Sequence, residues 1–480
     1  MINTKRLAAQ ESARCLLCND ASCNAACLNN LNPADFIRSL RFENFNTTLQ
    51  STEHCSDCSA PCEKACIHPD KPIRIKELID FNKPISHNEN NISLEVDFCG
   101  IKCENPFFLS SSVVASDYDM CARALNMGWG GIVYKTIGIM PIKEASPRFD
   151  AVYRDGSEFF AFRNWEQISQ KPYKEDFDTL SRLKKEFPSK VIVASIMGQN
   201  EEEWEKLTEM CNSASVDIIE CNFSCPHMSE GGLGSDVGTN EKLVSSFTAA
   251  VRRKTKIPIL AKMTPNITNV ETTAIAAIKA GAAGIAAINT IKSLTSVLET
   301  APYQLCNGTI SGLSGKAVKP IAMRFINDIR SSLPDTPISG MGGIETWYDA
   351  AEFLALGCAN VQITTAVMQY GYRIIDDLIN GLKSYLSKNN MTLWGLIGQA
   401  NIVSAGLLDR STMVLPVVDR DKCVGCGRCF LSCRDGGHGA IIFENQKPKL
   451  IGNKCEGCML CSLVCPLGAI LKSKRIIKKE

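Results

Sequence analysis

The cysteines of this chain fall into short, regularly spaced runs near both ends. Of the 24 cysteines, eight lie within residues 15–66 and eight within residues 423–465. A chain of 480 residues is too long for a small secreted disulfide scaffold. Close-spaced cysteines in such a chain are better explained as metal ligands. The two ends of the chain are therefore predicted to carry metal sites.

The C-terminal runs read CVGCGRCFLSC and CEGCMLCSLVCP. Their C-x2-C-x2-C-x3-C spacing is typical of a ferredoxin with two [4Fe-4S] clusters, in which the fourth cysteine of each run ligates the other cluster. Zinc is the alternative, but structural zinc usually takes pairs of cysteines. The predicted ligand sets are Cys423, Cys426, Cys429 and Cys465 for one cluster, and Cys455, Cys458, Cys461 and Cys433 for the other.

The N-terminal runs, CLLCNDASCNAAC and CSDCSAPCEKAC, form an imperfect repeat with a less standard spacing. Between them, Phe36, Leu40 and Phe45 recur at helical intervals, which indicates a helix. Zinc stays open as the alternative here as well. The same exchange of fourth ligands predicts two more [4Fe-4S] clusters, one on Cys15, Cys18, Cys23 and Cys66, and one on Cys55, Cys58, Cys62 and Cys27.

One cysteine outside these runs could carry out chemistry itself. Cys225 lies in ECNFSCPHM, between strand-forming residues and a proline. A thiol with an ordinary pKa of about 8.5 is mostly protonated at neutral pH, which suits a general acid. A nucleophilic cysteine would need a base, for which His227 is a candidate, and a buried inert thiol is the third possibility. The glycine-rich MSEGGLGSDVG that follows predicts a lid over the site.

The elements that position Cys225 are short apolar runs, each followed by a helix-like stretch. Such alternation predicts parallel strands, and eight units over roughly 300 residues fit a (β/α)8 TIM barrel. An open doubly wound sheet is the runner-up, although no G-x-G-x-x-G follows any run. The eight runs are residues 106–112, 131–136, 191–197, 217–223, 258–264, 284–290, 337–343 and 361–367.

Polar or basic residues end almost every run, and in a barrel these ends meet at one face. They are Ser111, Lys135, Thr136, Asn222, Lys262, Thr264, Asn289, Thr290, Gly342, Gly343, Thr364 and Thr365. Small residues and hydroxyls after the last two runs predict a phosphate site. A strand-end lysine could stabilise a reduced flavin. Because a flavin links one-electron clusters to hydride chemistry, and because FMN has one phosphate, FMN is the expected cofactor.

Composition divides the chain into three expected domains. Residues 1–85 form an N-terminal, α-helical iron–sulfur domain, residues 88–415 the FMN-binding barrel and residues 416–480 a ferredoxin-like domain. A net charge of +1 indicates neither a nucleic acid nor a membrane partner. The N-terminus lacks a signal-peptide pattern, and no apolar run reaches membrane-span length. We therefore expect a cytoplasmic protein.

Residues 88–480 resemble dihydropyrimidine dehydrogenase, specifically the catalytic FMN/iron–sulfur subunit of the bacterial two-subunit type. The motifs that carry the resemblance include NPFFLSSS, YKTIG, RNWEQI, IECNFSCPHM, LAKMTPNI, AAINTIKS, GMGGIETW and DKCVGCGRC. Residues 1–85 resemble the N-terminal iron–sulfur domain of the long single-chain form, whose FAD and NADPH domains have no counterpart in these 480 residues. Ile79 stands where that form has a glutamine cluster ligand.

The resemblance implies reversible reduction of the 5,6 double bond of uracil or thymine, with hydride from FMN N5 to C6 and a proton from Cys225 to C5. It implies electrons relayed by [4Fe-4S] clusters from a partner flavoprotein or ferredoxin, in a homodimer or hetero-oligomer. The implied pyrimidine-binding residues are Asn164, Glu166, Asn222, Ser224, Asn289 and Thr290. The implied FMN-binding residues are Ser111, Lys135, Thr136, Lys262, Gly315, Gly342, Gly343, Thr364 and Thr365.

The asparagines suit a pyrimidine on chemical grounds, because an amide offers both donors and an acceptor to the alternating N–H and C=O groups of the ring edge. Two alternatives remain. A dihydroorotate dehydrogenase-like enzyme would need a basic residue for the substrate carboxylate, and Arg163 stands beside Asn164. A non-catalytic electron-transfer subunit would not need Cys225, Asn222 and Asn289.

Overall fold

The computed structural model describes residues 5–44, 55, 57–79, 81, 92–144, 146–152, 159–224, 235–294, 309–403, 405–407 and 409–478. The chain forms two compact units. The barrel unit comprises residues 42–48 and 83–400, and the cysteine-rich unit comprises residues 1–41, 49–82 and 401–480. Among the described residues, no helix combines the length and the apolar character needed to cross a membrane.

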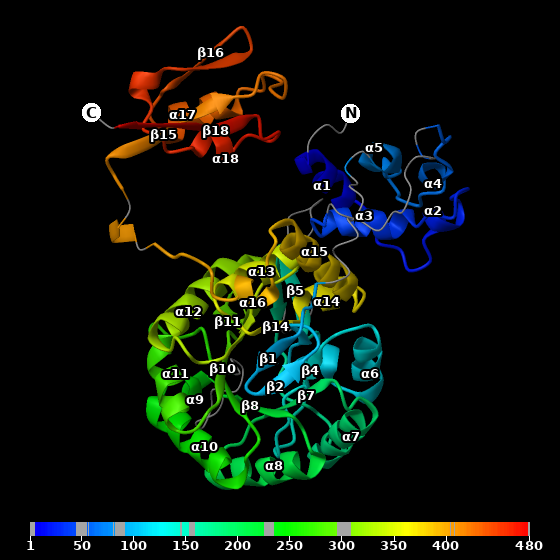
Figure 1. Ribbon diagram of the computed structural model, residues 1–480, viewed down its shortest axis with the longest axis vertical. Coiled ribbons are helices and arrows are strands. Elements are labelled where there is room, and N and C mark those ends of the chain that lie inside the picture. Colours follow the sequence, from blue (N-terminus) through cyan, green and yellow to red (C-terminus); the bar gives the residue numbers. More distant parts are fainter. Residues whose placement is uncertain are drawn as a thin grey trace. The chain divides into compact units, whose positions relative to one another are not determined.

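Eight parallel strands close into a barrel, in the order β10-β13-β14-β3-β4-β7-β8-β9 (Figure 1). Seven of the strands fall within their predicted runs and the eighth, β14, begins one residue before its run, so the (β/α)8 prediction is confirmed. The strands are β3 (Phe107–Leu109), β4 (Gly131–Val133), β7 (Val191–Ile196), β8 (Ile218–Asn222), β9 (Ile259–Lys262), β10 (Gly284–Ala287), β13 (Ile338–Met341) and β14 (Asn360–Ile363).

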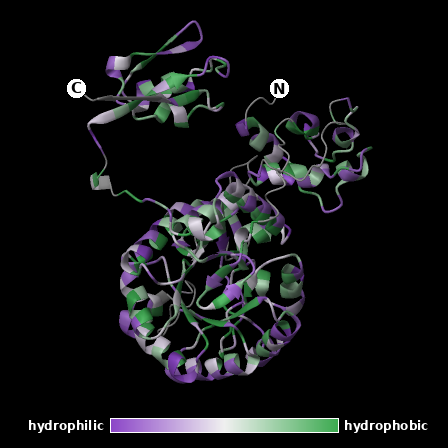
Figure 2. Ribbon diagram, viewed as in Figure 1, coloured by the Kyte–Doolittle hydropathy of each residue, from purple (hydrophilic) through white to green (hydrophobic). Residues whose placement is uncertain are grey.

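The barrel strands are apolar and β-branched because both of their faces are covered. All six residues of β7 are buried, and so are all five of β8. Side chains in the lumen pack against one another, while those on the outer face pack against helices. Register is set by pairs such as Val193 with Ile218 and Ile285 with Ile338. Figure 2 shows the hydrophobic residues gathered on the strands and the hydrophilic ones along the outer helices.

The helices around the barrel are amphipathic, and several begin with a side-chain cap. In α8, Trp204, Leu207 and Cys211 are buried, and the Asn200 side chain caps its first turn by accepting from the backbone N–H of Glu203. The helices of this unit are α6 (Tyr118–Asn126), α7 (Tyr173–Glu186), α8 (Glu201–Ala214), α9 (Ser235–Gly238), α10 (Glu241–Lys254), α11 (Val270–Lys279), α12 (Lys319–Ser332), α13 (Trp347–Ala355), α14 (Thr365–Tyr370), α15 (Ile374–Lys388) and α16 (Leu393–Leu396).

An additional antiparallel sheet, which the sequence did not predict, is built from the loops after β4 and β10. Its strand order is β11-β12-β6-β5. The strands are β5 (Phe149–Val152), β6 (Ala161–Asn164), β11 (Ile291–Ser293) and β12 (Ser311–Ser314). Because loops after barrel strands form the active-site face, this sheet brings Asn164 on β6 to the barrel's functional end. A separate hairpin, β1 (Val96–Phe98) and β2 (Ile101–Cys103), precedes β3.

The cysteine-rich unit has short helices at its N-terminal end and two small antiparallel sheets at its C-terminal end. The predicted helix is α3, in which Phe36 and Leu40 are buried; Phe45 lies outside the described residues. The helices are α1 (Lys5–Ala13), α2 (Ser22–Ala25), α3 (Pro33–Arg41), α4 (Pro61–Lys64), α5 (Ile75–Ile79), α17 (Arg428–Gly436) and α18 (Leu460–Leu463). The strand pairs are β15 (Thr412–Val418) with β18 (Ile470–Lys478), and β16 (Ile441–Glu444) with β17 (Lys447–Leu450).

Candidate active site and cluster sites

A pocket of about 1010 Å³ lies at the carboxyl ends of the barrel strands. Most of the residues predicted to bind substrate or FMN line it. These are Ser111, Asn164, Glu166, Asn222, Lys262, Asn289, Thr290, Gly315, Gly342, Gly343, Thr364 and Thr365. Lys135, Thr136 and Ser224 are not among the lining residues, and their contacts are described below. Cys225, His227 and residues 228–234 lie outside the described residues.

One side of the pocket is a glycine cradle. Gly315, Gly342 and Gly343 have φ angles of +85°, +120° and +82°, a region that favours glycine. A Cβ on Gly343 would lie 2.8 Å from the backbone nitrogen of Lys319 and 2.9 Å from the carbonyl oxygen of Gly315. Glycine is therefore required at Gly343 by close packing of the protein's own backbone. The hydroxyl of Thr365 is held by Ser314 Oγ, 2.9 Å away. The backbone N–H groups of such a glycine-rich loop, with hydroxyls beside it, have the donor chemistry for a phosphate.

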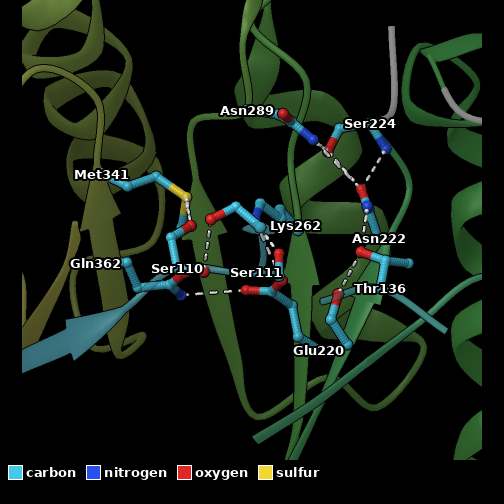
Figure 3. A network of polar contacts seen from close by, with 12 residues as sticks. Ser110, Ser111, Thr136, Glu220, Asn222, Ser224, Lys262, Asn289, Met341 and Gln362 are labelled. Atoms are coloured by element: carbon cyan, nitrogen blue, oxygen red, sulfur yellow. Dashed lines mark hydrogen bonds and ion pairs between the residues drawn. The ribbon is translucent and has the colours of Figure 1, made fainter. Parts of the chain in front are cut away.

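A second side of the pocket is a buried ionic network (Figure 3). Nζ of Lys262 donates to Ser111 Oγ over 2.8 Å and to Glu220 Oε1 over 3.2 Å. Ser111 Oγ in turn donates to Glu220 Oε1 over 3.1 Å. The other carboxylate oxygen of Glu220 accepts from Gln362 Nε2 over 3.1 Å. Gln362 also lines the pocket, and its buried Oε1 has no hydrogen-bond partner among the described residues, which leaves an acceptor for a bound polar ring.

Two of the asparagines that line the pocket, Asn222 and Asn289, are fixed by hydroxyls next to them. Asn222 Nδ2 donates to Thr136 Oγ1 over 2.9 Å, and Asn222 Oδ1 accepts from Ser224 Oγ over 3.0 Å. Asn289 Nδ2 donates to the same Ser224 Oγ over 2.8 Å (Figure 3). Thr136 and Ser224 therefore support the amides from outside the lining. Thr136 occupies one of the two Asn222 N–H donors; the other has no acceptor among the residues that the structure describes and suits a ligand.

Two further charged residues have contacts that their sequence positions did not reveal. Lys135 Nζ lies 2.8 Å from Glu166 Oε1 and 3.5 Å from Glu144 Oε1, so this lysine neutralises the carboxylate that lines the pocket. Arg163 is fully buried. Its guanidinium donates to Asp150 Oδ2 and to Ser311 Oγ, at 2.9 and 3.0 Å, and lies over the Trp165 ring. Arg163 does not line the pocket and so is not placed to meet a ligand carboxylate there.

The clustered cysteines gather into four sets. Three sets each line a small cavity: Cys423, Cys426, Cys429 and Cys465; Cys433, Cys455, Cys458 and Cys461; and Cys15, Cys18, Cys23 and Cys66. The fourth set is Cys27, Cys55, Cys58 and Cys62. Burial raises the pKa of Cys62 to about 11, and the neighbouring thiols Cys27 and Cys58 raise it further. Burial, followed by the same two thiols, also raises the pKa of Cys55.

Each set has the members expected from the spacing, namely the first three cysteines of one run and the fourth cysteine of the other run. Within the described residues, no three His, Cys, Asp or Glu side chains come close enough to hold a single metal ion directly. In three of the sets the cysteines surround a cavity, which suits the sulfur-only ligand chemistry of an iron–sulfur cluster. Glu220 and Gln362 were missed by sequence reasoning. The signal for Glu220 was a carboxylate inside an otherwise apolar strand, DIIECNF.

Comparison with known proteins decides the family. Residues 93–386 match the family model described as dihydroorotate dehydrogenase. The flanking segments match a 4Fe-4S dicluster domain, over residues 416–472, and dihydropyrimidine dehydrogenase domain II, 4Fe-4S cluster, over residues 2–91. The NAD-dependent dihydropyrimidine dehydrogenase subunit PreA of Escherichia coli K12 is 51% identical over 388 residues, which span 78% of this chain and 94% of that protein. The chain belongs to the dihydropyrimidine dehydrogenase family.

Other relatives share the barrel at lower identity. The chloroplastic dihydropyrimidine dehydrogenase (NADP(+)) of Arabidopsis thaliana is 36% identical over 323 residues, 63% of this chain and 76% of that protein. The catalytic subunit of dihydroorotate dehydrogenase B (NAD(+)) of Pyrococcus abyssi is 37% identical over 298 residues, 62% of this chain and 94% of that protein. Dihydropyrimidine dehydrogenases and dihydroorotate dehydrogenases thus share a flavin-binding barrel, and this chain combines it with 4Fe-4S domains.

Proposed function

We propose that this chain is an oxidoreductase that reversibly reduces uracil or thymine to the 5,6-dihydropyrimidine. The observation that carries the proposal is the composition of the pocket. Asparagine amides from three separate elements converge on it, through Asn164, Asn222 and Asn289. Such amides can read the alternating N–H and C=O groups of a neutral pyrimidine edge without supplying net charge.

The charges of the pocket favour a neutral pyrimidine over dihydroorotate. The charged residues that line it, among those described, are Glu166, Glu345 and Lys262. Lys262 is already paired with Glu220, and Arg163 is engaged by Asp150 outside the lining. A substrate carboxylate would therefore find no uncommitted cation among the described lining residues, and leaving it unpaired in a partly buried site is costly.

The residues of the pocket fit FMN. The glycine cradle and Thr365 offer close backbone and hydroxyl contacts for one phosphate, and Lys262 and Gln362 offer a cation and an acceptor for the ring. When bound, FMN supplies two-electron transfer to the pyrimidine and exchanges single electrons with iron–sulfur clusters. Asn222 and Asn289 then orient the ring, and their own orientation is fixed by Thr136 and Ser224.

We assign the proton at C5 of the pyrimidine to Cys225. This residue directly follows Ser224, whose hydroxyl joins Asn222 and Asn289. A protonated thiol can hold its proton until carbanion character develops at the ring carbon, which is what a general acid must do. In the alternative, Cys225 is a nucleophilic thiolate, and His227 is the base that removes its proton.

The four cysteine sets support four [4Fe-4S] clusters, about 16 irons per chain. The Escherichia coli relative is named as a subunit of an NAD-dependent enzyme. We therefore propose that a partner flavoprotein subunit passes electrons from NADH to the clusters of this chain. A ferredoxin donor is the alternative, and the expected assembly is a hetero-oligomer.

The experiment is to purify the full chain anaerobically, measure its iron and FMN, and follow dihydrouracil oxidation with a dye as electron acceptor. The proposal predicts about 16 irons, one FMN per chain and dye reduction that depends on dihydrouracil. Protein that is loaded with iron but holds no flavin and has no dihydrouracil activity would instead indicate an electron-transfer subunit.

A further inference from the structure

The centre of the barrel contains a carboxylate for which the proposed reaction has no direct use. Glu220 on β8 is fully buried, and its partner Lys262 on β9 is 4% exposed. Placing a carboxylate in a protein interior is costly unless it is paired and hydrogen-bonded. Replacing a buried ion pair with apolar residues is often neutral or stabilising, so the pair is weak evidence for a role in stability alone.

The environment of Glu220 holds its carboxylate fixed in place. Its two oxygens receive three hydrogen bonds, from Lys262, Ser111 and Gln362, and these partners come from other barrel strands or the residues just after them (Figure 3). Gln362 is itself held by Ser339, because its Nε2 also donates to Ser339 Oγ over 2.9 Å. Three of these residues, Ser111, Lys262 and Gln362, line the pocket, whereas Glu220 lies behind them.

We propose that Glu220 is a positioning residue that fixes Lys262 at the pocket and offsets its positive charge, so that the flavin bound there has a lower reduction potential. The proposal rests on the proposed FMN site. A reduced flavin carries more negative charge than an oxidised one, so an uncompensated cation beside it would favour the reduced form. Charge close to the ring is one of the means by which a protein tunes this cofactor.

The same pairing of a strand-end lysine with a carboxylate recurs on the next side of the pocket, where Lys135 meets Glu166. Lys262, the cation among the described lining residues, is thus also paired with a carboxylate. In the low dielectric of a barrel core, even a partial imbalance between two such charges changes the electrostatic energy of a bound flavin more than it would at the surface. Removing the charge of Glu220 while keeping its shape should therefore leave the positive charge of Lys262 uncompensated.

The test is the midpoint potential of the flavin, measured by anaerobic dye-coupled titration of the full-length, flavin-loaded protein without any pyrimidine. For Glu220→Gln we expect the midpoint potential to rise by about 30 mV. For a two-electron couple this corresponds to an about tenfold higher ratio of reduced to oxidised flavin at a fixed potential. Glu220→Met is a second neutral variant with a different shape, and the same direction is expected. In the double variant E220Q/K262Q, which removes both charges, the potential should return to the wild-type value or fall below it.

Asp176→Asn is the matched control. Asp176 is also a fully buried carboxylate, hydrogen-bonded by Tyr134 at 2.9 Å, and it does not line the pocket, so its neutralisation should leave the potential unchanged. An unchanged potential in both Glu220 variants would overturn the proposal. So would a raised potential that persists in the double variant, because Glu220 would then not act through Lys262. Since no pyrimidine is present, the result is independent of whether the enzyme oxidises dihydrouracil.

Discussion

Nζ of Lys135 lies 2.8 Å from Oε1 of Glu166, in an ion pair whose side chains are only 7% and 10% exposed. The pair joins the loop after β4 to the loop after β6, and it places a neutralised carboxylate in the pocket lining. Removing one member of a buried pair leaves an uncompensated charge, whereas removing both does not. This difference makes the pair testable by stability alone.

Lys135→Met should lower the free energy of unfolding by about 3–5 kcal/mol, because Glu166 loses its closest cation. The double variant K135M/E166Q should recover the part of that loss that comes from Glu166, while Glu144, 3.5 Å from Lys135 and also buried, still lacks its cation. Denaturant unfolding of the flavin-loaded protein measures both. Arg182→Met is the control: it breaks an exposed pair with Glu186 and should cost about 1 kcal/mol or less. Equal stabilities for the single and the double variant would show that the Lys135–Glu166 pair does not carry the effect.

Cys225→Ala should retain FMN and bind pyrimidine, yet its turnover should fall by about 10²- to 10⁴-fold, the usual contribution of a general acid. Steady-state dye reduction gives the rate, and the change in flavin absorbance on adding uracil gives the binding. Cys211→Ala removes a buried thiol of α8 that does not line the pocket and should leave the rate unchanged. Undiminished turnover in Cys225→Ala would remove this residue from the proton step.

Gly343→Ala should weaken FMN binding, whereas Gly371→Ala should not. Both glycines have a φ near +80°, so an added Cβ imposes similar backbone strain at the two positions. Only at Gly343 does the Cβ also meet backbone atoms closer than 3.0 Å, while at Gly371 it meets no atom within 4 Å. Flavin released on dilution, followed by fluorescence, measures the affinity. Equal loss of flavin from the two variants would mean that backbone strain, and not a disturbed glycine cradle, weakens FMN binding.

The exchanged ligand pairing predicts which cysteine substitutions share one cluster. Cys423→Ala and Cys465→Ala should each remove about four irons, and their double variant should remove no more than either alone. The double variant of Cys455 and Cys465 should remove about eight, because these two residues line different cavities. Cys358→Ala, a buried thiol of the barrel unit, is the control for iron content. The opposite pattern of losses would assign Cys465 to the cluster of its own run.

Much of this architecture could be predicted from the sequence because its signals are local. The eight apolar runs were found one by one, and each contains a strand, since burial on both faces imposes a continuous apolar pattern. The cysteine sets could be grouped because short spacings fix the ligand loops. The amides Asn222 and Asn289 follow strands, where a barrel gathers its functional residues. Their roles toward a ligand remain predictions.

What the sequence could not provide depends on contacts between distant segments. The β5–β6 and β11–β12 strands are short and only partly apolar, and they pair across more than a hundred residues, as Asn164 does with Gly312. Lys135 was expected at the flavin, but its closest contact is Glu166, far along the chain. Arg163 was a candidate for a substrate carboxylate until the fold placed it against Asp150. Side-chain partners of this kind are set by tertiary packing, which local patterns do not encode.

The central claim is that the pocket selects a neutral pyrimidine. The most direct measurement compares kcat/KM for dihydrouracil and for dihydroorotate on the same anaerobic, flavin-loaded preparation, with one dye acceptor. The account predicts efficient oxidation of dihydrouracil and little or none of dihydroorotate, because Lys262 is paired with Glu220 and Arg163 is not among the described lining residues. Turnover of dihydroorotate alone, with dihydrouracil left untouched, would contradict it.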